Sequence, residues 1–163
     1  MNGSQSSEDH GEKPAANSVL RGFDRFEFAR ARQSANMTVQ ELGKRAGVDR
    51  AAIHRWESGE CLPLVNSLSL AAAAMGLLPE HFLAVPKSEQ TLTDLRSMAG
   101  LTQAKLAERT GISRKILGGL ESGRGRLTSE RASALADALK VSEKTIHEAH
   151  NRSARLSQHS SQN

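Results

Sequence analysis

A short pattern of residues occurs twice in this chain. The segment GVDRAAIHRWESG at residues 47–59 returns as GISRKILGGLESG at residues 111–123, so that Gly59 and Gly123 stand 64 positions apart. A gap-free register of this length is hard to reach by chance, and it predicts an internal duplication with two similar folded units. The same offset aligns further identical residues: Arg32 with Arg96, Thr38 with Thr102, Leu42 with Leu106, and Arg45 with Arg109.

The composition favours helices over strands. Hydrophobic residues make up 37% of the 163 residues, but aromatic residues make up only 3%. Leu and Ala favour helix, whereas the residues that favour strands are thinly spread. We therefore predict an all-α protein whose two units are small helical domains.

Capping residues and apolar spacing divide each copy into five short helices. In the second copy, Thr102 caps the second helix, Gly111 ends it in a conformation that suits glycine, and Ser113 caps the third helix. We predict the fourth helix of this copy at residues 129–139 and the fifth at residues 142–147.

Polar ends and a central proline set the predicted domain boundaries. Pro86 interrupts helix formation between the two copies. The ends of the chain are polar and poor in core residues, which predicts disorder. We therefore predict a disordered N-terminal tail at 1–17, a first domain at 18–84, a linker at 85–88, a second domain at 89–150 and a disordered C-terminal tail at 151–163.

The residues around each predicted turn form a known motif. A helix, a tight turn with Gly and a second helix can place the second helix in the DNA major groove. The second copy carries Thr102-Gln103, Leu106-Ala107, Gly111-Ile112-Ser113 and Glu121-Ser122-Gly123, and on these residues it resembles the lambda-repressor-like helix-turn-helix family (Xre/Cro type). The first copy departs at Val39, Gly43 and Asp49, where that family has Gln, Ala and Ser. The resemblance implies two tandem five-helix DNA-binding domains.

The resemblance also implies which residues contact DNA. It makes residues 49–57 and 113–121 the recognition helices, with Arg50 and Arg114 at the end that the family directs at base edges, where Arg can hold guanine through two hydrogen bonds. The alternative is that these arginines are ordinary solvent-exposed residues without a role in DNA binding. The predicted DNA-binding residues are Thr38, Arg50, Ala51, His54, Arg55, Ser58, Thr102, Gln103, Arg114, Lys115, Gly119, Ser122, Arg124 and Arg126.

Two adjacent glycines interrupt the second recognition helix. Gly118 and Gly119 each cost a helix about 1 kcal/mol relative to Ala. One interpretation is that this copy has lost its DNA role. The other is that small residues let the helix backbone approach DNA closely, and the following Arg124 and Arg126 favour this second interpretation. The first copy has Glu60 in that loop, which phosphate would repel.

An arginine and a glutamate recur at one separation in both copies. Glu57 follows Arg32 by 25 residues, and Glu121 follows Arg96 by 25 residues. In proteins that this motif resembles, such residues form a largely buried pair between the first and third helices. We therefore predict the structural ion pairs Arg32–Glu57 and Arg96–Glu121, and we give the glutamates no catalytic role.

The remaining sequence features exclude several functional classes. No paired catalytic groups, phosphate-binding loop or zinc-ligand spacing is present, so we expect no enzyme, no cofactor and no metal site. No apolar run could span a bilayer, and the single Cys61 cannot form an internal disulfide. These features predict a cytoplasmic protein without a membrane partner.

The predicted function is sequence-specific binding of double-stranded DNA, with repression of transcription by operator occupancy. The net charge of +4 fits a phosphate-backbone partner without requiring one. The alternative is an antitoxin or anti-activator that binds a protein partner through one copy of the motif. The sequence is compatible with a homodimer and with a monomer. Single domains of this family usually dimerise, whereas a tandem chain could read two sites as a monomer.

Overall fold

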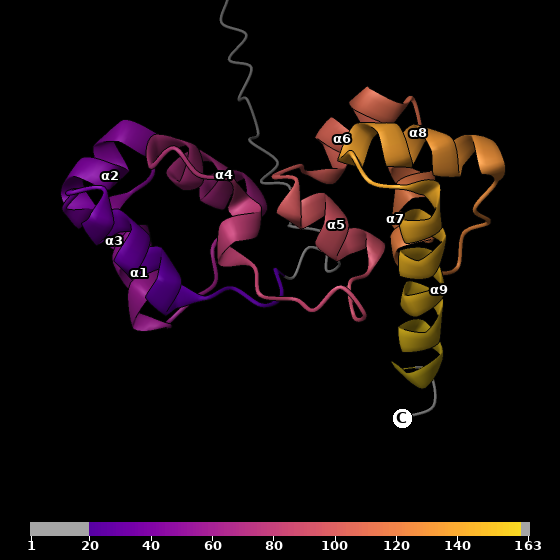
Figure 1. The fold of residues 1–163 in the computed structure, drawn as a ribbon, viewed down its shortest axis with the longest axis horizontal. Coiled ribbons are helices and arrows are strands. Elements are labelled where there is room, and N and C mark those ends of the chain that lie inside the picture. Colours follow the sequence, from indigo (N-terminus) through magenta and orange to yellow (C-terminus); the bar gives the residue numbers. More distant parts are fainter. Residues whose placement is uncertain (1–19, 161–163) are drawn as a thin grey trace, which may run out of the picture.

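Helices form in both copies of the repeat (Figure 1). The structure is a computed structural model, and it describes residues 20–160. Within that range it contains helices and one isolated β-bridge, between Phe23 and Leu83; this confirms the all-α prediction. The first unit contains α1 (Arg25–Ser34), α2 (Val39–Ala46), α3 (Arg50–Ser58), α4 (Val65–Ala74) and the 3₁₀ helix η1 (Pro79–Phe82). The second unit contains α5 (Leu92–Met98), α6 (Gln103–Thr110), α7 (Arg114–Glu121), α8 (Ser129–Leu139) and α9 (Glu143–Ser160).

Side-chain caps begin the helices of the turn motif at the predicted residues. The Thr38 hydroxyl accepts the backbone N–H of Glu41 at 3.1 Å, and the Glu41 carboxylate accepts the backbone N–H of Thr38 at 2.7 Å. The hydrogen bond from the Thr38 backbone lowers the pKa of Glu41. The hydroxyls of Thr102 and Ser113 cap α6 and α7. These starts are therefore encoded locally, by side chains that satisfy otherwise unpaired N–H groups.

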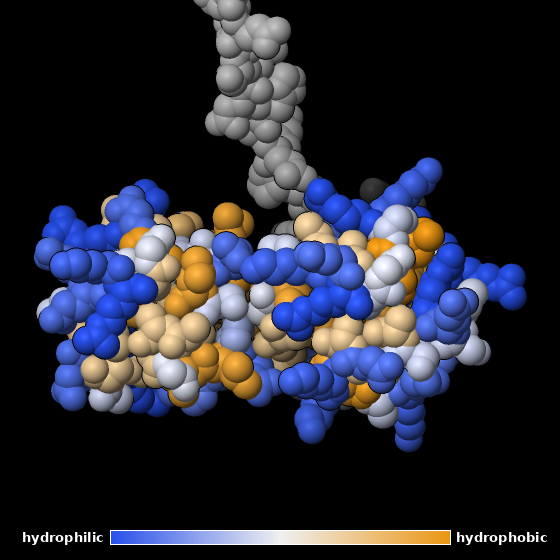
Figure 2. Space-filling model, turned by 90° about the horizontal axis from the view of Figure 1, so that it is seen from above, coloured by the Kyte–Doolittle hydropathy of each residue, from blue (hydrophilic) through white to orange (hydrophobic). Residues whose placement is uncertain are grey.

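Each unit has a hydrophobic core of its own. In the first unit the buried ring of Phe28 lies 5.7, 5.8 and 5.2 Å from the rings of Phe23, Trp56 and Phe82. The second core is aliphatic. On the face drawn in Figure 2, hydrophobic residues gather over the middle of the molecule, whereas hydrophilic side chains crowd both ends. The buried residues of the second core include Leu95, Leu106, Leu117, Leu120, Leu135 and Ile146.

The prediction of a disordered tail at residues 151–163 is wrong for the residues up to Ser160. One helix, α9, continues well beyond the predicted fifth helix at 142–147. Its buried residues Ile146, Ala149 and Ser153 recur every three or four positions, so one face packs while the polar residues that suggested disorder cover the others. No Pro or Gly ends the helix earlier. Residues 161–163 and the predicted N-terminal tail at 1–17 lie outside the described residues.

The two units contact each other through α5 and α6, and α5 packs against the 3₁₀ helix η1 of the first unit. Gly100, directly after α5, lies so close to α4 that an added Cβ would be 2.7 Å from the Ser69 hydroxyl oxygen. The Lys105 ammonium of α6 donates to the Asn66 side-chain oxygen of α4 at 3.2 Å. The predicted linker at 85–88 contains no helix or strand.

An ion pair joins the start of the first unit to the start of α5. The Arg21 guanidinium donates to both carboxylate oxygens of Asp94, at 3.1 and 2.5 Å, and to the Glu89 carbonyl at 3.2 Å. The Asp94 side chain is only 4% exposed and also accepts hydrogen bonds from the backbone and hydroxyl of Thr91. Burial acts to raise the pKa of Asp94, but the hydrogen bonds from Arg21 and Thr91 outweigh it and lower this pKa.

Acid should weaken the fold through Asp94. Because its pKa is lower in the folded than in the unfolded chain, the stabilisation by its carboxylate is complete above the unfolded pKa and is lost as the pH falls through the folded pKa. Asp94→Asn should therefore lower the free energy of unfolding at neutral pH and flatten its decline in acid. Urea denaturation at steps between about pH 7 and pH 3 measures both effects. Parallel pH curves for the two proteins would contradict this expectation.

Candidate nucleic-acid interface

Two glycines shape the turn between α2 and α3. Gly47 ends α2 in the left-handed region, with φ of +66°. One turn earlier, Gly43 lies so close to the turn that an added Cβ would be 2.7 Å from the Val48 carbonyl oxygen. This close approach gives a physical reason for Gly43, where the resembling family has Ala. The turn brings α3 against α2 with its first residues facing outward.

Helix α3 buries one side and exposes the other. The Asp49 carboxylate caps it by accepting the Ala51 backbone N–H at 3.1 Å. Ile53 and Trp56 face the core and are 0% and 4% exposed. The exposed side carries five residues predicted to contact DNA, which are Arg50, Ala51, His54, Arg55 and Ser58.

Helix α7 repeats this arrangement in the second unit. Leu117 and Leu120 are buried in the core, while Arg114 and Lys115 are exposed at the first two helical positions. The two recognition helices therefore present arginine at equivalent starts, and both do so after a side-chain cap. Because backbone N–H groups gather at a helix start, this end of each helix also favours an anionic partner.

The two adjacent glycines of α7 have different surroundings. An added Cβ at Gly118 would meet nothing within 4 Å. The Gly119 carbonyl accepts the backbone N–H groups of Arg124 and Gly125, at 3.0 and 2.8 Å, so the following loop folds back on the helix. A Cβ at Gly125 would lie 2.8 Å from the Gly119 backbone. Packing therefore requires glycine at Gly125, whereas nothing in the described part of the chain requires it at Gly118.

Gly118→Ala should stabilise the protein but weaken its binding to DNA. Ala is favoured over Gly in a helix by about 0.5–1 kcal/mol, and the space around Gly118 is open. Gly118 occupies the position that exposed His54 has in α3, so the added methyl group should separate α7 from DNA. Chemical denaturation and fluorescence anisotropy with a duplex measure the two effects. Unchanged DNA affinity of Gly118→Ala would argue against close approach of α7 to DNA.

Gln103, which the sequence predicts to contact DNA, makes a hydrogen bond inside its unit. Its side-chain nitrogen donates to the Glu121 carboxylate at 2.7 Å. The first copy has Val39 at this position. The hydroxyls of Thr38 and Thr102 accept the capping hydrogen bonds of α2 and α6. All three side chains thus have partners within the fold, and their contact with DNA stays a prediction.

An Arg–Glu pair links the first and third helices of each unit. Arg32 Nε and Nη2 lie 2.6 and 2.9 Å from the two carboxylate oxygens of Glu57, and this hydrogen bonding raises the pKa of Arg32. Arg96 donates to both carboxylate oxygens of Glu121 and to the Leu101 carbonyl. The side chains are 11% and 17% exposed in the first pair but only 1% and 2% in the second. The second pair is therefore the more completely removed from water.

The loop after the recognition helix differs in charge between the units. In the second unit Arg124 and Arg126 are exposed, which suits phosphate contacts. In the first unit Glu60 stands at the position of Arg124 and is exposed as well. The Ser58 hydroxyl lies 3.1 Å from the Arg55 carbonyl oxygen and 2.9 Å from the Glu60 carboxylate, and its single proton can be donated to either acceptor. Of these two loops, the one in the second unit therefore carries the exposed positive charge.

Residues that the sequence did not single out hold the ends of both recognition helices. The Ser157 hydroxyl of α9 donates to the Ser122 carbonyl at the end of α7, and Gly123 leaves no room for a side chain against α9. In the first unit, Arg25 of α1 donates to the Ser58 carbonyl. The continued apolar spacing of α9 was the available signal for the former contact. No local sequence pattern predicts the contact between Arg25 and Ser58.

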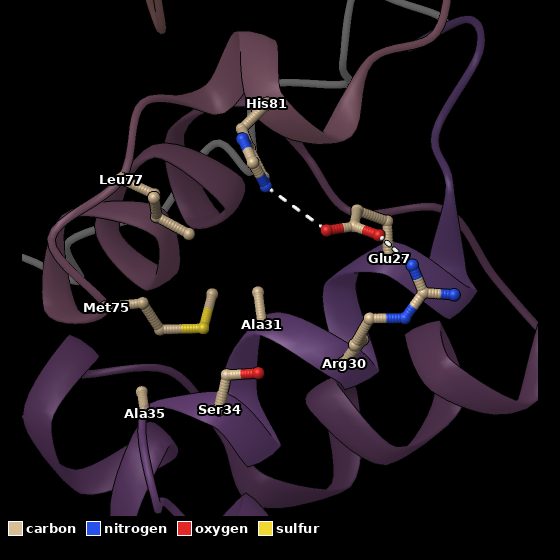
Figure 3. A pocket seen from close by; sticks show the side chains of 8 residues that line it. All are labelled: Glu27, Arg30, Ala31, Ser34, Ala35, Met75, Leu77 and His81. Carbon is tan, nitrogen blue, oxygen red and sulfur yellow. Dashed lines mark hydrogen bonds and ion pairs between the residues drawn. The ribbon is translucent and has the colours of Figure 1, made fainter.

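A pocket of about 320 Å³ lies beside α1 in the first unit. Figure 3 shows His81 of η1 pointing across it toward Glu27 of α1, 3.2 Å away, and Glu27 also pairs with Arg30 at 2.8 Å. Met75 and Leu77 supply apolar lining. None of the lining residues belongs to α2 or α3, so this pocket is separate from the candidate DNA interface.

The described residues give no positive sign of a metal centre or a membrane segment. Between residues 20 and 160, no three His, Cys, Asp or Glu side chains lie close enough together to hold a metal ion. Over the same range, no helix combines the length and the apolar character needed to cross a bilayer.

Two capped recognition helices, each following a glycine turn, define a tandem helix-turn-helix protein. A helix-turn-helix family matches the chain twice, at residues 28–82 and 92–146. The chain therefore belongs to the Xre/lambda-repressor-like helix-turn-helix family, which consists of DNA-binding regulators of transcription. Comparison with curated proteins gave no match, and comparison with solved structures gave none either.

Proposed function

We propose that this chain is a transcriptional repressor that occupies operator DNA through both of its units. The observation that carries the proposal is the exposed arginine at the capped start of each recognition helix, Arg50 in α3 and Arg114 in α7. An arginine in this position can donate two hydrogen bonds to guanine O6 and N7 in the major groove. A protein bound there blocks access of other proteins to the same DNA.

The two units would contribute different contacts to the binding of DNA. In α3, His54 and Arg55 extend the contact surface beyond Arg50. In α7, the glycines allow the backbone itself to approach the base edges, and Arg124 and Arg126 supply the charge for phosphate contacts. The second unit should therefore contribute more of the salt-dependent affinity, because each neutralised phosphate releases counterions.

Selection of bound duplexes from a random DNA pool, at a defined salt concentration, tests this proposal. We expect enrichment of a sequence with two half-sites, and footprinting should then show protection of both. A palindrome indicates two chains on the site, whereas two unlike half-sites indicate one chain that uses both units. A reporter gene placed downstream of the selected site should lose expression when the protein is produced. A pool without enrichment would refute sequence-specific binding.

A second candidate is an antitoxin or anti-activator that binds a protein partner through the first unit. What favours it is the loop after α3, where Leu62 and Leu64 are exposed next to Glu60. Apolar side chains beside an acidic one suit a protein surface better than a phosphate backbone. Leu62→Ser/Leu64→Ser should leave DNA binding unchanged under either candidate. It should abolish capture of a protein partner only under the second.

A further inference from the structure

We propose that the Arg21–Asp94 ion pair fixes the relative position of the two units, so that this chain selects DNA by the spacing between two half-sites. Arg21 and Asp94 would then be positioning residues that contact no base. The proposal rests on the proposed function in one respect only, which is that both units bind DNA. The rigidity of the contact between the units can be tested without DNA.

The anchoring of Arg21 is the first step of the argument. Leu20, the preceding residue, is buried in the first core and only 3% exposed. The Gly22 carbonyl accepts the Ala84 backbone N–H at 2.8 Å, and the next residue, Phe23, forms a β-bridge with Leu83. Arg21 is therefore held between a core residue and a paired backbone, and its position is fixed relative to the first unit.

The partner of Arg21 is equally fixed in the second unit. Asp94 lies in the first turn of α5, where it closes a capping box with Thr91. Two hydrogen bonds from one guanidinium to one carboxylate define an orientation as well as a distance. Because Arg21 also donates to the Glu89 carbonyl, it holds the residue directly after the linker against the first unit.

Further contacts between the units restrict rotation about this ion pair. Met98 of α5 packs against the first core, and Gly100 lies against Ser69. Lys105, which lines one pocket together with Ser69 and Gly100, donates to Asn66. An ion pair, an apolar contact and a hydrogen bond at separate points hold two bodies more firmly than one point does. The two recognition helices should therefore keep one distance and one angle.

The DNA consequence follows from helical geometry. One inserted base pair turns a half-site by about 34–36° around the duplex axis, since a turn contains about 10–10.5 base pairs. Units joined by a flexible linker follow such a change, whereas rigidly joined units lose simultaneous engagement. Simultaneous engagement contributes about 10²–10⁴-fold to affinity and is lost when the geometry forbids it.

Distance measurement between two spin labels tests the rigidity. The exposed Cys61 carries one label in the first unit, and Asp137→Cys, on the exposed side of α8, carries the other. We expect a single narrow distance distribution, and a broad one after Arg21→Glu, which places like charges together. Arg30→Glu is the matched control, since its partner Glu27 lies in the same unit. A broad distribution in the parent, or a narrow one after Arg21→Glu, would overturn the proposal.

A spacing series on the selected duplex tests the effect on DNA. The parent protein should lose about 100-fold or more in affinity when one base pair is inserted between the half-sites. Arg21→Glu should bind the original duplex more weakly and should lose less than about tenfold on the same insertion. Equal spacing profiles would overturn the proposal. A parent that selects only one half-site would contradict tandem binding, and the label distances would still report on the rigidity.

Discussion

Glu121→Ala should lower the free energy of unfolding of the second unit by about 3–5 kcal/mol, because it strands a buried guanidinium. The Arg96 side chain is 1% exposed, so water cannot replace the lost carboxylate. Gln103 loses its hydrogen-bond acceptor in the same substitution. Chemical denaturation measures the loss in the free energy of unfolding. Amide hydrogen exchange of α5 and α7 then assigns this loss to the second unit.

The duplicated unit supplies the matched control. Glu57→Ala removes the equivalent carboxylate, but its Arg32 partner is 11% exposed and can gain water. We expect a smaller loss from Glu57→Ala than from Glu121→Ala. A double-mutant cycle with Arg96→Ala and Glu121→Ala should show strong coupling. Additive losses in that cycle would contradict the claim that the Arg96–Glu121 ion pair stabilises the second unit.

The sequence alone was sufficient to predict features that depend on residues close together in the chain or on a spacing that both copies share. Thr38, Thr102 and Ser113 begin helices where their hydroxyls accept the N–H group three residues ahead, so the local sequence determines these starts. The Arg–Glu separation of 25 residues was interpretable because it occurs twice and because the resemblance implied a pair between the first and third helices. Repetition thus supplied a check that a single copy lacks.

Other features depend on packing partners that are distant in sequence. Residues 151–160 of α9 look like a polar tail, but Arg152 contacts the Gln90 carbonyl and Ser157 contacts the end of α7. Gln103 matched a family motif, but the nearby Glu121 carboxylate gives its amide a partner inside the fold. Arg21 and Asp94 are 73 residues apart and belong to no motif. Periodicity and motifs cannot report such contacts, because they arise only after the chain has folded.

Paired alanine substitutions in the two recognition helices should each weaken binding to the selected duplex by about 30- to 1,000-fold. Arg50→Ala/Arg55→Ala removes two exposed cations from α3, and Arg114→Ala/Lys115→Ala removes two from α7. A base contact contributes about 1–3 kcal/mol and a second, weaker contact to phosphate about 1 kcal/mol, so that losing both costs about 2–4 kcal/mol. Fluorescence anisotropy at several salt concentrations measures the affinity and its salt dependence.

A control with the same loss of charge separates contact from general attraction. Arg30→Ala/Lys144→Ala also removes two exposed cations, but neither lies in α3 or α7. It should change affinity only slightly, because exposed charges farther than about 10 Å from the phosphates are screened at 0.1 M salt. Comparable losses from both recognition-helix pairs support tandem reading of DNA. A loss from the α7 pair alone favours a protein partner for the first unit, and no loss from either pair refutes the assignment of the interface.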